Sequence, residues 1–81
     1  MTRVRLEPNQ RRTWILNEAV KIANRDGLMK TTVLVVASRA GFAPATVRYY
    51  FNRNADLWNC ILSHPKVSKP VIAEGHKIGL R

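Results

Sequence analysis

The chain has 81 residues, which is enough for one small domain. Fourteen Lys and Arg against five Asp and Glu give a formal net charge of +9, and this excess indicates a polyanionic partner, most often nucleic acid. An anionic membrane surface is the alternative partner. No apolar run approaches the roughly 18 residues of a membrane span. A content of 46% hydrophobic residues excludes a disordered tail.

Residues 1–8 read as a basic N-terminal arm that ends at Pro8. Arg3 and Arg5 alternate with apolar residues in this arm. Basic arms of some DNA-binding proteins reach the minor groove, so Arg3 and Arg5 are candidate DNA contacts; a frayed terminus is the alternative. The stretch lacks the apolar centre of a secretory signal, so no export is expected.

A first helix is predicted from a cap at Asn9 to about Asp26, where Gly27 ends it. An apolar stripe of helical period supports it, made by Ile15, Leu16, Ala19, Ile22 and Ala23. Arg11 and Arg12 lie in its first turn, where the helix dipole disfavours cations. This local cost suggests phosphate contact, with solvated surface as the alternative.

The stretch from Thr32 to Phe51, TVLVVASRAGFAPATVRYYF, predicts two short helices joined by a tight turn. Thr32 can cap the first, Gly41 can end it in left-handed backbone, and Pro44 fits the first turn of the second. Each helix has an apolar face, made by Val33, Val36, Ala37 and Ala40 in one and by Val47, Tyr50 and Phe51 in the other. This is the helix-turn-helix pattern, whose second helix lies in the DNA major groove.

A fourth helix, capped by Asn54 or Asn52, is predicted to run to about Leu62, with Leu57 and Ile61 inward. Pro65 disfavours helix at the preceding residue.

The remaining tail is apolar in part but broken by Pro70, Gly75 and Gly79, which predicts an irregular or strand-like segment or an arm around a second subunit. The expected fold is therefore an all-α bundle of about four helices. Its expected parts are an arm (1–8), a helix-turn-helix domain (9–64) and a tail (65–81) that could serve as a dimerisation arm.

About residues 11–62 resemble the DNA-binding domain of the TetR family of regulators. The residues in register are Arg12, Ile15, Leu16, Ala19, Ile22, Ala23, Gly27, Thr32, Val36, Ala37, Ala40, Gly41, Phe42, Thr46, Val47, Tyr50, Phe51 and Leu57. Three departures stand out: Ala43 replaces the usual capping Ser, Arg48 the usual Tyr, and residues 53–55 the usual Ser-Lys-Glu. The phosphate contacts that the family draws from that Tyr and Lys must therefore come from other groups.

The resemblance implies a DNA-binding regulator. In the family, the fourth helix continues into a large effector domain, whereas only residues 66–81 follow here. No small-molecule pocket is therefore expected, and the chain is similar in plan to the compact repressors of bacteriophages.

The candidate DNA contacts are Lys30, Thr32, Arg39, Pro44, Ala45, Thr46, Arg48, Tyr49 and Arg53, with Arg3 and Arg5 of the arm. Arg48 is the first candidate for base readout, because a guanidinium can bridge O6 and N7 of guanine; contact with phosphate alone is the alternative. Thr46 matches a family position that commonly contacts the backbone. Lys30, Arg39 and Arg53 are expected at phosphates.

One recognition helix reads only about 4–5 base pairs, so a homodimer on a two-fold DNA site is expected. Its expected surface is the fourth helix with the tail, namely Trp58, Cys60, Ile61, Val71 and Ile72. The expected function is a sequence-specific transcriptional repressor. The alternatives are an architectural DNA-binding protein, the isolated DNA-binding domain of a longer ligand-responsive regulator, and a basic interaction module. RNA is disfavoured, because no sheet carries paired aromatics.

Catalytic and metal sites are not expected. Cys60 is the only cysteine, which excludes an internal disulfide, and with two histidines it gives no zinc-binding spacing. No nucleophile–base set, glycine-rich phosphate loop or carboxylate pair stands out. We therefore expect no enzyme and no cofactor, and a reducing cytoplasm as the compartment.

Overall fold

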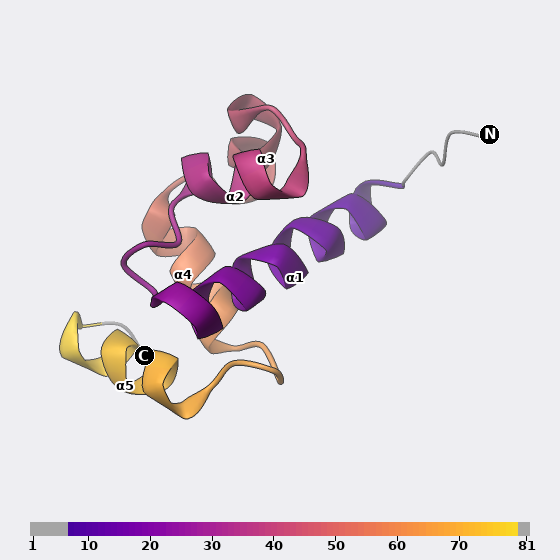
Figure 1. Cartoon of the computed structure of the whole chain (residues 1–81). Coiled ribbons are helices and arrows are strands. Elements are labelled where there is room, and N and C mark those ends of the chain that lie inside the picture. Colours follow the sequence, from indigo (N-terminus) through magenta and orange to yellow (C-terminus); the bar gives the residue numbers. More distant parts are fainter. Residues whose placement is uncertain (1–6, 80–81) are drawn as a thin grey trace.

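The computed structural model of the chain describes residues 7–79, which form five helices and no strand (Figure 1). The helices are α1 (Pro8–Asp26), α2 (Val33–Ala40), α3 (Pro44–Tyr50), α4 (Asn54–Leu62) and α5 (Lys69–Lys77). The prediction of an all-α bundle is confirmed, with one helix more than expected.

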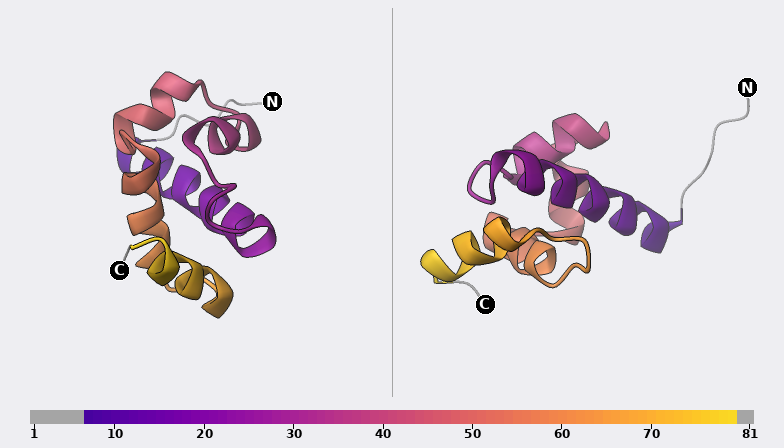
Figure 2. Two further views of the ribbon diagram at one scale, coloured as in Figure 1. Left: turned by 90° about the vertical axis from the view of Figure 1, so that its left-hand side faces the viewer. Right: turned by 60° about the horizontal axis from the view of Figure 1, so that its bottom comes forward.

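α1 is the axis of the fold. It packs against α2, α4 and α5, while α3 packs against α2. Figure 1 and Figure 2 show the α2–α3 pair and α5 on opposite sides of α1.

One hydrophobic core joins all five helices and the link before α2. Its buried members include Ile15, Ala19, Leu28, Val36, Val47, Phe51, Leu57, Ile61 and Val71. Phe51, at the end of α3, is the largest of these and is 1% exposed. The Arg12 guanidinium lies 5.0 Å from the centre of the Phe51 ring, so a cation covers the face of this core aromatic.

α1 begins earlier than expected. Its N-cap is Glu7, whose N–H donates to Gln10 Oε1 at 2.9 Å, and Pro8 is the first helical residue. The prediction of Asn9 as the cap is wrong, since a proline at the first position has no N–H to leave unpaired and comes with preset backbone. At the other end Gly27 has φ +99°, and a Cβ there would lie 3.3 Å from Glu74 Oε1.

The prediction of an irregular or strand-like tail is wrong over Lys69–Lys77, which form α5. Pro70 lies in the first turn, where proline favours a helix instead of breaking it. Gly75 is buried against α4, where an added Cβ would lie 2.6 Å from Leu62 Cδ1. Pro70 thus favours the start of α5, and Gly75 allows α5 to pack closely against α4.

Side chains of α1 hold the link between α4 and α5. The Asn24 amide donates to the Lys66 carbonyl oxygen at 3.0 Å and accepts from the Ser68 N–H at 2.9 Å. His64 Nδ1 accepts from the Lys66 N–H at 3.1 Å. The hydrogen of neutral His64 is therefore on Nε2, which lies 3.2 Å from Asn17 Oδ1.

The link between α1 and α2 is held from α4 and α5. The Glu74 carboxylate accepts from the N–H groups of Leu28 and Met29, at 2.5 and 3.0 Å. Trp58 Nε1 donates to the Thr31 carbonyl oxygen at 2.8 Å. Two distant helices therefore fix the point at which α2 begins.

Candidate nucleic-acid interface

The α2–α3 pair is built from local signals. Thr32 Oγ1 accepts from the Val35 N–H at 3.2 Å, which confirms Thr32 as the cap of α2. Gly41 has φ +80°, the left-handed conformation that glycine adopts at helix ends. Pro44 then opens α3, and the fully buried Val47 anchors this helix in the core.

α3 turns a broad face to solvent. A helix turns about 100° per residue, which places Arg48 and Tyr50 about 200° apart across the side away from Val47, with Ala45 and Tyr49 between them. Tyr49 is 81% exposed, and its ring meets that of Tyr50 edge-on, with centroids 4.9 Å apart. The centre of the face is therefore small or aromatic, and polar groups lie at its two edges.

At one edge, a hollow of about 320 Å³ surrounds the N-terminus of α2. It is lined by Thr32, Val33, Leu34, Arg48, Asn52, Arg53 and Asn54. The N-cap of α4 is Arg53, so the prediction of Asn54 or Asn52 as its cap is wrong. Asn54 Oδ1 instead accepts from the Val33 N–H at 2.9 Å, which joins α4 to the first turn of α2. Two arginines beside a helix N-terminus favour an anion such as phosphate, and we call this the α2 pocket.

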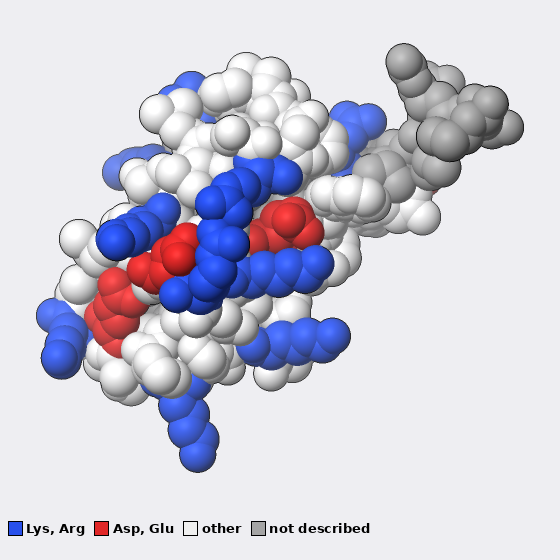
Figure 3. Space-filling view, in the orientation of Figure 1, with Lys and Arg blue, Asp and Glu red and all other residues white. Residues whose placement is uncertain are grey.

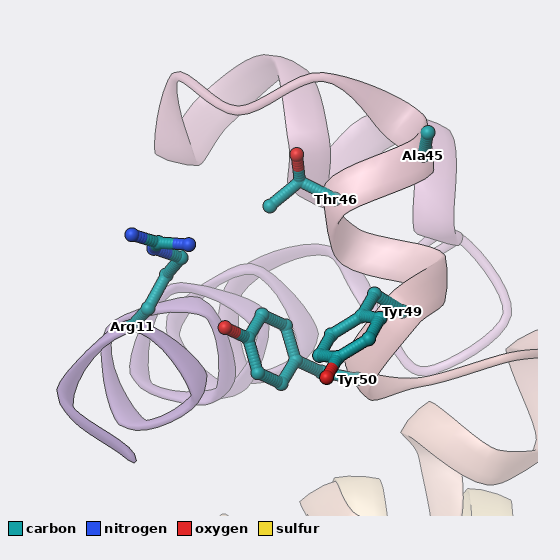
Figure 4. A pocket seen from close by; sticks show the side chains of 5 residues that line it. All are labelled: Arg11, Ala45, Thr46, Tyr49 and Tyr50. Carbon is teal, nitrogen blue, oxygen red and sulfur yellow. The ribbon is translucent and has the colours of Figure 1, made fainter. Parts of the chain in front are cut away.

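At the other edge, a hollow of about 440 Å³ lies between α3 and the first turns of α1 (Figure 4). It is lined by Arg11, Ala45, Thr46, Tyr49 and Tyr50. The side chains of Arg11, Thr46 and Tyr50 extend toward the same space, whereas Ala45 points away. We call this hollow the α1–α3 cradle; its polar groups are one guanidinium and hydroxyls.

Charge is distributed unevenly over the fold. Residues 32–53 contain three arginines and no Asp or Glu. In the view of Figure 3 the acidic side chains lie over α1 and α5, among Lys and Arg, while the α2–α3 part shows basic side chains only. A polyanion that approaches α3 therefore meets no carboxylate within the pair.

The structure brings some predicted contacts together and separates others. Thr32, Arg48 and Arg53 line the α2 pocket. Lys30 and Arg39 are exposed and lie outside both hollows, within electrostatic reach of Asp26. The pKa of Asp26 is lowered mainly by its hydrogen bond with Arg25, and the charges of Arg39 and Lys30 add to this. Of the other predicted contacts, Ala45, Thr46 and Tyr49 line the cradle, Pro44 is exposed, and Arg3 and Arg5 lie outside the described residues.

Two residues predicted for the dimer surface lie in the core instead. Ile61 is 0% and Val71 is 2% exposed, because α4 and α5 turn these side chains toward one another and toward α1. Assigning Ile61 and Val71 to a dimer surface was therefore wrong. Trp58, Cys60 and Ile72 are half-buried, and Arg12 Nη2 lies 3.5 Å from Cys60 Sγ.

Helical spacing predicts Tyr50 on the apolar face of the second helix and does not show that Arg11 lies beside that helix. Tyr50 is half-buried, so its ring packs while it also lines the cradle. The spacing of Thr46 and Tyr50, four residues apart, carried the signal that they share one edge of α3. The approach of α1 to that edge could not be read from spacing.

Metal sites and membrane-spanning helices are two further possibilities for a chain of this composition. Residues 7–79 contain no group of three His, Cys, Asp or Glu side chains that could hold a metal ion. No helix among them combines the length and the apolar character that crossing a bilayer requires.

Comparisons with protein-family models, with curated proteins and with solved structures found no match to this chain.

Proposed function

We propose that this chain is a sequence-specific DNA-binding transcriptional regulator that inserts α3 into the major groove. The observation that carries the proposal is the arrangement around α3. An exposed face free of carboxylates is bordered on both sides by hollows that contain arginine. A DNA duplex offers base edges in a groove about 12 Å wide with a phosphate backbone on each side. The two arrangements are complementary.

Within this proposal the centre of the α3 face reads bases. Ala45 and Tyr49 lie there, and the methyl group of Ala45 suits the methyl group of a thymine. Arg48 lies at the edge, in the α2 pocket with Arg53. This position favours phosphate contact for Arg48 over the guanine readout that its side chain alone suggests. Arg48 and Arg53 would then replace the Tyr and Lys phosphate contacts of the TetR family, which the chain resembles in residues 11–62.

The proposed assembly is a homodimer on a two-fold site, since one α3 reads too few base pairs for selectivity. Trp58, Cys60 and Ile72 keep part of their surface and are the remaining candidates for the contact between subunits. DNA binding alone can repress by covering a promoter, so we propose a repressor that acts in a bacterial cytoplasm.

Selection from random-sequence duplex DNA tests the proposal. Wild-type protein should enrich a short inverted repeat, and binding should weaken as salt rises. The Tyr49→Ala variant should bind the selected duplex less tightly and relax the preference at one or two base pairs. Enrichment of no sequence, with uniform weak binding that salt abolishes, would instead support an architectural protein. Absence of any DNA binding would refute both readings.

A further inference from the structure

We propose that the α1–α3 cradle is a second phosphodiester-binding site, which holds the DNA strand opposite to the one held by the α2 pocket. This inference rests on the proposed function and extends it to a surface of α1. The ligand class is a backbone phosphate of duplex DNA.

The side chains that line the cradle are donors that suit phosphate oxygens. Arg11 supplies a guanidinium, and Thr46 and Tyr50 supply hydroxyls that can donate hydrogen bonds. Among residues 7–79, no carboxylate lines the cradle. Planar guanidinium donors together with hydroxyls suit the oxygens of a phosphate, and charge-assisted hydrogen bonds of this kind are the stronger ones.

Arg11, Thr46 and Tyr50 are carried by helices that the hydrophobic core holds in place. Arg11 precedes the fully buried Ile15 by four residues on α1, so the core fixes the helix that carries it. Tyr50 is half-buried, and its ring is met edge-on by Tyr49. Thr46 lies one turn before Tyr50 on α3, and both point toward the Arg11 side (Figure 4). A phosphate would therefore find donors already gathered.

The cradle and the α2 pocket lie at opposite edges of the exposed face of α3. The cradle borders the Thr46–Tyr50 edge of α3, while the α2 pocket borders the Arg48 edge, about 160–200° away across the exposed face of the helix. A helix in the major groove has one flank toward each strand. Sites at the two edges of α3 therefore meet phosphates of different strands, and together they fix how deeply and at what angle α3 enters the groove.

The test uses the full chain and the duplex obtained by selection, with four variants. Arg48→Ala removes a donor of the α2 pocket and reports the strand that this pocket contacts. Arg11→Gln and Tyr50→Phe each remove a donor of the cradle, and Tyr50→Phe keeps the ring and its packing. Arg25→Gln is the matched control, because it makes the same change on α1 about 21 Å away along the helix. Thermal melting verifies that each variant is folded.

Two measurements carry the test: the slope of log K against log salt, and interference by ethylation of single phosphates. Arg11→Gln should reduce the magnitude of the slope by about 0.9, and Tyr50→Phe should weaken binding roughly threefold to tenfold. In both variants, ethylation at one phosphate should lose its effect on binding, and that phosphate should lie on the strand opposite to the one affected by Arg48→Ala. Arg25→Gln should match wild type.

The outcomes separate the cradle from the proposed function. If wild type binds DNA but Arg11→Gln and Tyr50→Phe have wild-type slopes and interference patterns, the cradle is not a phosphate site and the role of α3 stands. If both sites affect phosphates on the same strand, the two-strand geometry is wrong. If wild type does not bind DNA, the proposed function fails together with the cradle.

Discussion

The two sides of α1 differ in how they use charge. On the α5 side, a carboxylate stabilises the fold: Glu74 accepts hydrogen bonds from two backbone N–H groups of the link before α2. On the α2–α3 side, residues 32–53 contain no carboxylate, and Arg48 and Arg53 line an open hollow.

This difference separates stability from binding. The Glu74 carboxylate holds α5 to the link before α2, whereas residues 32–53 contain arginines and exposed surface but no carboxylate. Substitutions on the α5 side should therefore change the free energy of unfolding, and substitutions on the α3 side should change DNA affinity.

The largest effect is expected from Ile61→Ala. Ile61 is fully buried where α4 meets α1 and α5, so truncation should lower the free energy of unfolding by about 2–5 kcal/mol. Ile78→Ala makes the same change at a 37% exposed residue and should cost far less. Urea denaturation measures both. Equal stability of the two variants, with a change of oligomeric state in Ile61→Ala only, would return Ile61 to the dimer surface.

Next in size is the double variant Arg48→Ala, Arg53→Ala. Each arginine is expected to make a charged hydrogen bond to phosphate worth roughly 1.5 kcal/mol, so affinity for the selected duplex should fall about a hundredfold. The control is Lys69→Ala, Lys77→Ala, which removes the same charge from α5. Fluorescence anisotropy measures both. If the two double variants weaken binding equally, total charge rather than the α2 pocket governs affinity.

A smaller effect is expected from Glu74→Gln. The amide offers one acceptor oxygen where the carboxylate offers two, so one of the N–H groups of Leu28 and Met29 loses its acceptor. The free energy of unfolding should fall by about 1–2 kcal/mol. Glu18→Gln, which removes only an exposed pair with Lys21, is the control. A Glu74→Gln protein as stable as Glu18→Gln would show that the contact from α5 contributes nothing.

The smallest effect is a pH dependence at Asp26. The hydrogen bond from Arg25 lowers the pKa of the Asp26 carboxyl below its usual value of 3.8. A lowered pKa in the folded state stabilises the protein above the unfolded pKa, and this contribution is lost as the pH falls through the folded pKa. Wild type should therefore be slightly more stable than Asp26→Asn at neutral pH, and the two should converge as the pH falls through the lowered pKa of Asp26. A constant difference across that range would exclude the linkage.

The parts of the fold that depend on local chemistry were predictable. Thr32, Gly41 and Pro44 each act on the backbone next to them: α2 begins after Thr32 and ends before Gly41, and α3 begins at Pro44. The tail was not predictable in the same way. Gly75 looks like a helix breaker in sequence, and only the approach of Leu62 explains why a glycine is needed there.

Some features of the candidate site were likewise predictable from local sequence, and others depended on tertiary packing. That Thr46, Arg48 and Tyr49 would be accessible on α3 followed from helical spacing. That Arg48 would share a hollow with Thr32, and Thr46 with Arg11, depended on how α2 and α1 pack against α3. Helical spacing predicted that Ile61 faces inward, whereas the burial of Val71 depended on the packing of α5.

The most direct test of this account is an amide-resolved NMR titration of the protein with the selected DNA duplex. The account predicts that the largest shifts occur at residues 32–34 and 43–53 and in the first turns of α1, while Lys69–Lys77 of α5 change little. Shifts centred on α5, or no shifts at any DNA concentration, would contradict the assignment of DNA binding to α3.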